Sequence, residues 1–266
     1  MTAMTHPLSG FSAPTLHAKG VAAGYADRTI LRELDLAVHP GEIYALLGAN
    51  GAGKSTALNL FLGFLRPQSG TVRVQGIDPA AEPAQARRQL AYIPENVALY
   101  EHLSARENVA YLLHLAGQEA RDAAIGDALA SAGLDPTAHD RRVSGFSKGM
   151  RQKVSIGLAV ARQVPALLLD EPTSGLDPQA AADFHALLGS LRAKGVAVLM
   201  VTHDLLGAVD IADRIGFLDQ GRIVEEVQAE EAQAEQVQAS EGRAGCGERF
   251  DIRALHRRYA RLEAAR

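Results

Sequence analysis

The residues best suited to chemistry in this chain lie in one glycine-rich run, Gly48-Ala-Asn-Gly-Ala-Gly-Lys54-Ser55-Thr56. The run fits the phosphate-loop pattern G-x-x-x-x-G-K-[ST], in which glycines let successive backbone N–H groups point at phosphate oxygens. Lys54 can reach the β- and γ-phosphates, and Ser55 can hold Mg²⁺. The sequence therefore predicts a nucleotide site formed by Gly48, Ala49, Asn50, Gly51, Ala52, Gly53, Lys54, Ser55 and Thr56.

A strand and a helix must hold such a loop in place. The apolar run over residues 43–47 predicts a buried strand before it, and the pattern over 56–65 predicts a helix after it. The helix N-terminus places partial positive charge behind bound phosphates. The alternative is a glycine-rich turn that matches the pattern by chance. Because both flanking elements are expected, we favour the phosphate loop.

Two adjacent carboxylates form a second group, at the end of the apolar run Ala166-Leu-Leu-Leu-Asp170-Glu171. Asp170 can face Mg²⁺ beside Ser55. Glu171 can orient and deprotonate the water that attacks the γ-phosphate. By itself a capped strand end is the commoner explanation of such a run. Downstream of a phosphate loop, the pair predicts a metal ligand and a general base.

The run Phe146-Ser147-Lys148-Gly149-Met150-Arg-Gln resembles the signature sequence of ATP-binding-cassette (ABC) ATPases, usually Leu-Ser-Gly-Gly-Gln. Phe146, Lys148 and Met150 depart from that pattern, whereas Ser147 and Gly149 keep it. In the family this segment completes the nucleotide site of a second subunit, so that two cassettes clasp two ATP molecules. The alternative is an ordinary serine cap on the helix that follows.

Other elements of the family follow in order. Tyr25 lies where the family places an aromatic residue that stacks on adenine. Ser174-Gly-Leu-Asp177 resembles the loop that passes between the two subunits, and His203 resembles the switch histidine that hydrogen-bonds the γ-phosphate. The resemblance covers about residues 15–224 and implies binding of ATP and Mg²⁺. The catalytic residues that it implies are Lys54, Glu171 and His203.

Glu95 stands where the family usually has a glutamine that senses Mg²⁺ and contacts the transmembrane partner. A glutamate can still ligate Mg²⁺ or its water shell, so the expected metal residues are Ser55, Glu95 and Asp170. The segment over residues 92–100 resembles that of ATPases serving ABC-2-type exporters, including the type associated with nitrous oxide reductase maturation. This favours export over import and leaves the substrate open.

The fold expected is α/β: a P-loop NTPase core with a mostly parallel sheet, an antiparallel β subdomain and an α-helical signature subdomain. Alternating runs over 15–38 and a strand over 71–76 predict the β subdomain, and a helical pattern extends from 82 to about 131. Strand signals over 166–170, 196–202 and 214–218 are separated by helices, which is typical of parallel crossover units.

The expected divisions are an N-terminal extension over 1–14, the ABC ATPase domain over 15–224, a polar linker over 225–248 and a short amphipathic helix over 249–266. In that last segment apolar and arginine residues alternate at helical spacing. The segment could pack on the domain or anchor the chain to lipid or to a partner. The sequence leaves these alternatives open.

Composition narrows the functional classes. The net charge of −4 argues against an obligatory nucleic-acid partner, and the single cysteine, Cys246, suits a reducing cytosol. Met1–Pro14 lacks the apolar core of a signal peptide, and no run reaches the roughly 18 apolar residues of a membrane span. The expected protein is a cytoplasmic ATPase subunit, peripheral on the inner membrane. Its expected partners are an integral-membrane permease and a second ABC subunit, forming a homodimer or a heterodimer.

Rival functions share some of these motifs. A soluble assembly ATPase, of the kind used in iron–sulfur cluster building, would share all of them and would act without a permease. A translation-associated ATPase of the family usually carries two cassettes, and only one is visible. A Rad50-like repair ATPase needs a coiled-coil insertion that the segment between phosphate loop and signature is too short to hold.

Overall fold

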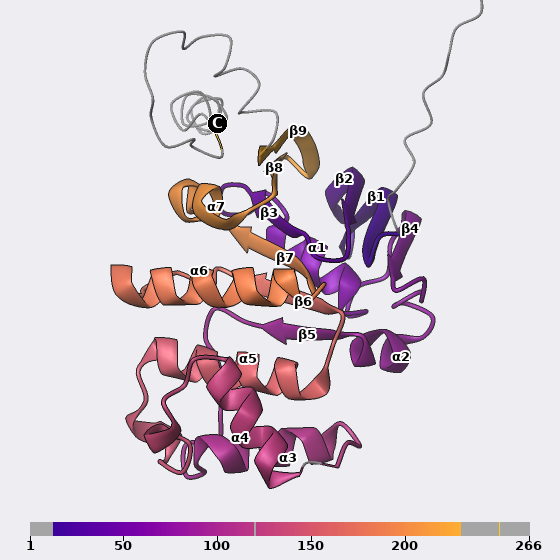
Figure 1. The fold of residues 1–266 in the computed structure, drawn as a ribbon. Coiled ribbons are helices and arrows are strands. Elements are labelled where there is room, and N and C mark those ends of the chain that lie inside the picture. The colour runs from indigo at the N-terminus through magenta and orange to yellow at the C-terminus, as the bar shows by residue number, and fades with distance from the viewer. Residues whose placement is uncertain (1–12, 120, 230–249, 251–266) are drawn as a thin grey trace, which may run out of the picture.

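The central sheet organises the molecule in the computed structural model, which describes residues 13–119, 121–229 and 250 (Figure 1). It has six strands. In spatial order they are β5 (Leu90–Ile93), β6 (Ala166–Asp170), β7 (Ala197–Thr202), β3 (Ile43–Leu47), β8 (Arg214–Asp219) and β9 (Arg222–Gln228). The strands from β5 to β8 in that order run parallel, and only β9 pairs antiparallel. The prediction of a mostly parallel sheet is confirmed.

Strand β3 shows how the sheet divides the core. All five of its residues are buried, because helices or strands cover both of its faces. Successive side chains of a strand point to opposite faces. Accordingly Ile43, Ala45 and Leu47 join one hydrophobic cluster, and Tyr44 and Leu46 join another.

The second of these clusters lies under a small antiparallel sheet. Its strands are β1 (Leu16–Tyr25), β2 (Arg28–Val38) and β4 (Ser69–Val74), in the order β2-β1-β4. Helix α1 (Lys54–Phe61) contributes its apolar side to the same cluster. The expected antiparallel β subdomain is therefore present, and it packs beside the helix that follows the phosphate loop.

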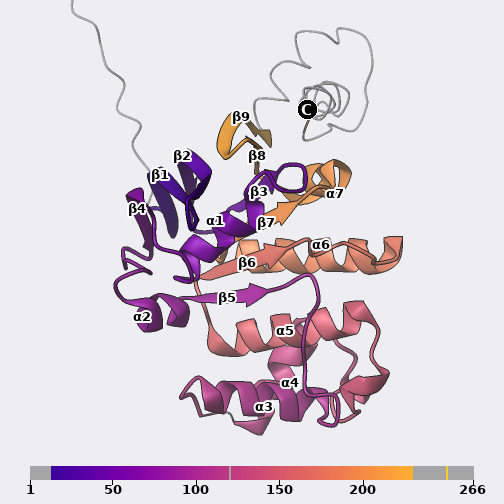
Figure 2. The same cartoon turned by 180° about the vertical axis from the view of Figure 1, so that it is seen from behind.

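Helices cover the opposite face and extend beyond it. Helices α5 (Lys148–Arg162), α6 (Pro178–Ala193) and α7 (Leu205–Ile211) pack against the first cluster. Helix α5 also packs with α3 (Ala105–Leu115) and α4 (Asp122–Ser131) in a third cluster, which forms the expected helical subdomain. In both views that subdomain lies at the end of the molecule away from the small sheet (Figures 1 and 2). The remaining elements are α2 (Pro83–Arg88) and the 3₁₀ helices η1 (Pro136–Ala138) and η2 (Val143–Gly145).

The helical pattern predicted from residue 82 to about residue 131 is wrong at β5. Leu90–Ile93 form a strand that pairs with β6 at the edge of the sheet. Four residues are too few to show a strand period, and the flanking sequence is helical in character. The edge position was therefore invisible in the local sequence.

The boundary predicted between residues 224 and 225 is also wrong. Residues 225–228 continue β9, which pairs with β8. Their burial alternates between exposed and intermediate, so the strand is polar and shows no apolar face that marks it in the sequence. The rest of the predicted linker, the C-terminal helix beyond Phe250 and the extension up to residue 12 lie outside the described residues. Phe250 is buried in the first cluster.

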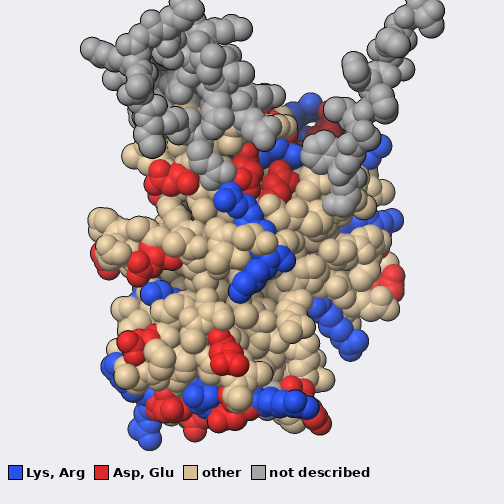
Figure 3. Space-filling view, viewed as in Figure 1, with Lys and Arg blue, Asp and Glu red and all other residues tan. Residues whose placement is uncertain are grey.

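The surface of the helical subdomain carries charges of both signs. Figure 3 shows Lys and Arg side chains interspersed with Asp and Glu there. Among the described residues no helix is both long enough and apolar enough to cross a bilayer.

Candidate nucleotide-binding site

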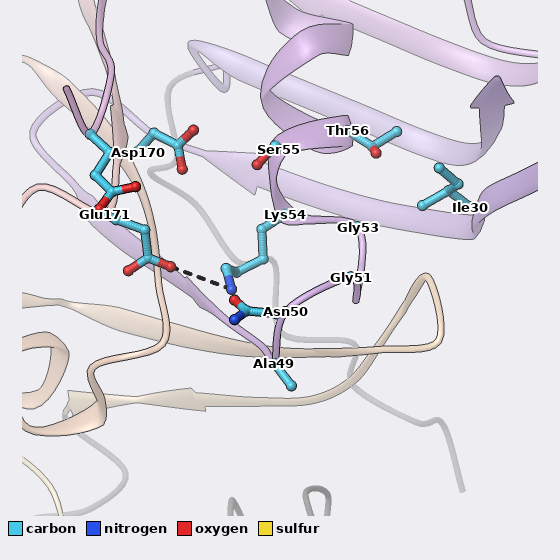
Figure 4. Close-up of a pocket in the computed structure, with 11 residues that line it drawn as sticks. Ile30, Ala49, Asn50, Gly51, Gly53, Lys54, Ser55, Thr56, Asp170 and Glu171 are labelled. Carbon is cyan, nitrogen blue, oxygen red and sulfur yellow. Dashed lines mark ion pairs between the residues drawn. The ribbon is translucent and has the colours of Figure 1, made fainter. Parts of the chain in front are cut away.

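A cleft of about 310 Å³ opens at the carboxyl ends of β3 and β6. The phosphate loop meets Asp170 and Glu171, at the end of β6, in this cleft (Figure 4). Glu95 also lines it. The residues that line the cleft are Ile30, Ala49, Asn50, Gly51, Gly53, Lys54, Ser55, Thr56, Glu95, Asp170 and Glu171. Ligands bind at this edge in open α/β sheets.

Glycines are required in the loop for two separate reasons. Gly51 and Gly53 have φ of 81° and 116°, a region that side chains rarely adopt. Space is the second reason, because a Cβ on Gly53 would lie 2.7 Å from Leu31 Cδ2 and one on Gly48 would lie 2.6 Å from the Leu218 carbonyl oxygen. Gly48 and the buried Ala52 thus support the loop from below rather than line the cleft.

Lys54 begins α1 and is buried. Its Nζ donates a hydrogen bond to the Gly48 carbonyl oxygen at 2.6 Å and lies 3.4 Å from Glu171 Oε1. Figure 4 shows the Lys54 and Glu171 side chains pointing toward one another across the cleft. The ammonium group is therefore already surrounded by oxygens, an arrangement that phosphate oxygens can enter.

Glu171 is held from a neighbouring strand. Its Oε2 accepts hydrogen bonds from Thr202 Oγ1 at 3.0 Å and from the His203 backbone N–H at 3.2 Å, and it lies 2.8 Å from His203 Nδ1. Parallel pairing of β6 with β7 places Asp170 beside Val201, so both strand ends arrive at the same edge. Glu171 has φ of 45°, which turns the chain sharply after the strand.

The protonation of Glu171 reflects opposing influences. Burial raises the pKa of its carboxyl, but the hydrogen bonds from His203 and the charge of Lys54 outweigh burial, so the pKa lies below its ordinary value. Glu171 is therefore a carboxylate at neutral pH, the form needed to accept a proton.

Asp170 has the opposite shift. Burial raises the pKa of its carboxyl; the Tyr92 hydroxyl, which donates to Asp170 Oδ2 at 3.3 Å, lowers it, and the charges of Glu171 and Glu95 raise it further. Burial and Asp170 together raise the pKa of Tyr92 to about 12, so this hydroxyl remains a donor. The concentration of negative charge favours a cation.

The donor set fits a hard divalent cation bound through few protein ligands. Asp170, Glu95 and the Ser55 hydroxyl line the same cleft, and all offer oxygen. Among the residues that the structure describes, no three His, Cys, Asp or Glu side chains form a ready-made metal cage. Mg²⁺ suits this arrangement because it is usually bound by one or two carboxylates together with water and substrate phosphates.

The remaining predicted residues lie outside the cleft lining. Ser147 caps α5, its Oγ accepting from the Met150 N–H at 3.3 Å, and Gly149 lies in the first turn of that helix. Asp177 caps α6, accepting from the Ala180 N–H at 2.9 Å. Tyr25 is 47% exposed, and its hydroxyl accepts from Asn59 Nδ2 at 2.8 Å. The structure therefore does not bring these four residues to the phosphate loop of their own chain.

Sequence reasoning missed two residues of the site. Ile30 lines the cleft from β2, and Thr202 donates to Glu171 from the end of β7. The signal for Thr202 was available, since it directly precedes His203 at the carboxyl end of a parallel strand. Ile30 had no such signal because its role depends on how the small sheet folds over the loop.

The fold and this cleft define a P-loop nucleotide-binding cassette. The model of the ABC transporter family matches residues 31–174. The chain belongs to the ABC transporter family, and it is an ATP-binding and ATP-hydrolysing protein.

Relatives agree with this assignment. The chain is 34% identical to the uncharacterized ABC transporter ATP-binding protein YdbJ of Bacillus subtilis, over 82% of this chain and 70% of YdbJ. It is 32% identical to the linearmycin resistance ATP-binding protein LnrL of the same species, over 79% of this chain and 68% of LnrL. It is 35% identical to the daunorubicin/doxorubicin resistance ATP-binding protein DrrA of Streptomyces peucetius, over 79% of this chain and 64% of DrrA.

Solved structures show the same fold. The ATP-binding subunit of an ABC transporter superimposes with a TM-score of 0.76 at 30% identity, covering 94% of this chain and 99% of that one. A dimeric ATP-binding cassette in a post-hydrolysis state, bound to ADP and Pi, superimposes with a TM-score of 0.70 at 26% identity, covering 80% of this chain and 98% of that one.

Proposed function

We propose that this chain is the ATPase subunit that powers export of a substrate through a separate integral-membrane permease. The observation that carries the proposal is the Glu171 carboxylate, held by Thr202 and His203 opposite Lys54 at the mouth of the phosphate-loop cleft. These contacts join the Glu171 carboxylate to β7 and to the phosphate loop, so it does not act simply as a cap at the end of β6. It is placed to act on a bound triphosphate.

The phosphate loop binds the triphosphate. Backbone N–H groups of the phosphate loop and the N-terminus of α1 surround the phosphates, and Lys54 exchanges part of its present oxygen contacts for the β- and γ-oxygens. Tyr25 is exposed beside the small sheet and is available to stack on adenine.

Mg²⁺ would be held by Ser55 and Asp170, with Glu95 as a ligand or as a hydrogen-bond acceptor for the metal's water. When bound, it neutralises charge on the β- and γ-phosphate oxygens. Burial raises the pKa of Asp170, and the nearby charges of Glu171 and Glu95 raise it further; this concentration of carboxylates supports the assignment.

Hydrolysis begins at Glu171. Its carboxylate accepts a proton from the attacking water as the water oxygen bonds to the γ-phosphorus and the bond to the leaving ADP oxygen breaks. His203 lies at Glu171 Oε2, so it can orient the base and contact the γ-phosphate. The products are ADP and phosphate.

Ser147 and Gly149 serve the nucleotide of a second subunit, and Asp177 lies in the loop that passes between the subunits. Support comes from their absence from the lining of the chain's own cleft and from the dimeric cassette with the same fold. The pair is a homodimer or a heterodimer with another cassette.

Export is favoured because LnrL and DrrA carry the names of drug-resistance proteins and other relatives are Nod factor export proteins. The Fe(3+) ions import ATP-binding protein FbpC 2 of Rhodococcus jostii also matches at 34% identity, so overall identity does not separate exporters from importers. The choice of export therefore rests also on residues 92–100, which resemble the segment of ABC-2-type exporter ATPases. The proposed location is the cytoplasmic face of the inner membrane.

Affinity purification from a detergent extract tests the transporter against the soluble assembly ATPase. We expect a protein with several membrane spans, about six, to co-purify with the tagged full chain in a stable ratio. A wash without detergent provides the control, because it should leave that partner in the membrane fraction. Recovery of soluble scaffold proteins without any membrane protein would instead support the assembly ATPase.

A further inference from the structure

Lys148 replaces the first glycine of the usual signature sequence, and its side chain turns back into its own chain. Its Nζ donates a hydrogen bond to the Ser174 carbonyl oxygen at 2.5 Å. Ser174 belongs to the turn between Glu171 and α6, and Lys148 is the first residue of α5. The lysine thus bridges the start of α5 and the turn that precedes α6.

A second bond runs onward from the same residue. Ser174 Oγ donates to Glu95 Oε1 at 3.1 Å. The bridge therefore consists of two hydrogen bonds in series, from Lys148 to the Ser174 backbone and from the Ser174 side chain to Glu95. It connects the N-terminal turn of α5 with a residue that lines the cleft.

A separate contact also ties the turn between Glu171 and α6 to helix α5. The buried Gln152 side chain donates from Nε2 to the Pro172 carbonyl oxygen at 2.5 Å. Two side chains, one turn of helix apart, thus hold the backbone of the same short turn. Both donate to main-chain oxygens, so they fix the position of the backbone and not merely that of a mobile side chain.

The geometry argues against a direct role of the Lys148 charge at a nucleotide. Its ammonium points to the Ser174 carbonyl oxygen, whereas Ser147 next to it is exposed. In this arrangement the Lys148 ammonium serves the backbone of its own chain.

We propose that Lys148 is a positioning residue that acts through Ser174 to set the place of the Glu95 carboxylate at the cleft. A movement of the N-terminus of α5 then reaches Glu95 of the same chain. The effect of this coupling on nucleotide binding rests on the proposed function, in which Ser147 faces the second subunit's ATP and Glu95 faces Mg²⁺. Occupancy of one site would thereby be sensed at the other.

Amide hydrogen exchange of the nucleotide-free full chain tests the first bond. The amides of Ser174 and Leu176 are protected by turn hydrogen bonds to Glu171 and Thr173. Loss of one hydrogen bond from a charged donor changes a local equilibrium by about tenfold. Lys148→Met keeps the stem but removes the ammonium, so we expect exchange over residues 173–176 to rise by about that factor.

Two variants serve as controls. Lys148→Arg keeps a cationic donor and should restore most of the protection. Lys153→Met removes a lysine of the same helix that pairs with Asp183 at 3.5 Å instead, and it should leave the exchange of the turn unchanged. Equal exchange in Lys148→Met and the parent protein would overturn the proposal.

The second bond is tested by the factor by which Mg²⁺ strengthens binding of a fluorescent, non-hydrolysable ATP analogue. Lys148→Met and Ser174→Ala should each reduce that factor several-fold, and the double variant should reduce it no further, because both cut one relay. Independent, multiplying effects would show that the relay does not exist. If Glu95→Gln alone leaves the factor unchanged, the metal role of Glu95 fails, and the exchange experiment still decides whether Lys148 holds the turn.

Discussion

Glu171 combines two requirements of a general base in this structure. Thr202 and His203 fix one carboxylate oxygen, and Lys54 faces the other. Burial by itself would raise the pKa of this carboxyl, so the contacts of His203 and Lys54 are what hold the pKa below its ordinary value. The same contacts link the base to the strand that carries His203, and changes at His203 should therefore be visible in the ionisation of Glu171.

His203→Ala should lower turnover and move the acid limb of the pH–rate profile to higher pH. The sign follows from the side-chain hydrogen bond of His203, which lowers the pKa of Glu171. Its removal takes away one lowering influence, so the pKa of Glu171 rises and the base is lost earlier on acidification. Steady-state ATPase rates measured from acidic to mildly alkaline pH give the profile. An acid limb at unchanged or lower pH would contradict the assigned contact.

Glu95→Gln should raise the Mg²⁺ concentration needed for half-maximal ATPase. The amide keeps the size and one carbonyl oxygen but loses the charge that a hard cation prefers. Titration of Mg²⁺ at fixed ATP, for both proteins, gives the comparison. Superimposable curves would assign Glu95 to the permease contact alone.

At the scale of elements, the sequence predicted those parts whose function fixes a local pattern. The phosphate loop needs glycines at set positions, so the spacing of Gly48 and Gly53, followed by Lys54 and Ser55, marks the loop in the sequence. The buried parallel strands are marked by apolar runs, because both of their faces are covered. Edge strands lack that constraint: β5 is too short and β9 too polar to show their period.

The contacts of the site were less predictable than its members. Asp170, Glu171 and His203 are recognisable from their motifs. The bridge from Lys148 through Ser174 to Glu95 is not, because it depends on how a helix start and a turn meet in space. Pairwise contacts between segments distant in the chain leave no periodic trace in a single sequence.

Ser147→Asp separates the capping role of this residue from its role toward a second subunit. Aspartate is as good a helix cap as serine, so the free energy of unfolding should change by less than about 0.5 kcal/mol. The added negative charge should repel the partner's γ-phosphate and prevent ATP-driven dimerisation. Thermal unfolding and light scattering with ATP give the two readouts. Ser147→Ala is the matched control, with an expected cost of about 1 kcal/mol from the lost cap.

If Ser147→Asp dimerises with ATP as strongly as the parent protein, the proposed role of Ser147 toward the second subunit is wrong and only its capping role remains. Both proteins are best compared alongside the permease, since an isolated cassette can associate too weakly to register.

At the scale of the whole molecule, the fold class was predictable because its three parts each have a sequence signature of their own. In the proposed mechanism, the binding energy of ATP couples the movements of these three parts. ATP can drive a conformational change only by binding the closed dimer more tightly than the open one. Hydrolysis removes that preference. The helical subdomain carries the Ser147 segment and lies at the end of the molecule away from the small sheet (Figure 1). In the function proposed above, turnover at Glu171 is the step that allows the assembly to reopen.

The most direct test of this account is ATP turnover by Glu171→Gln at saturating ATP and Mg²⁺. We expect the rate to fall by a factor of about 10² to 10⁴, the range for loss of a general base, while affinity for ATP stays within about twofold. Lys54→Ala is the contrasting control, because it should weaken ATP binding itself. Hydrolysis by Glu171→Gln at the rate of the parent protein would contradict the assignment of Glu171 as the base.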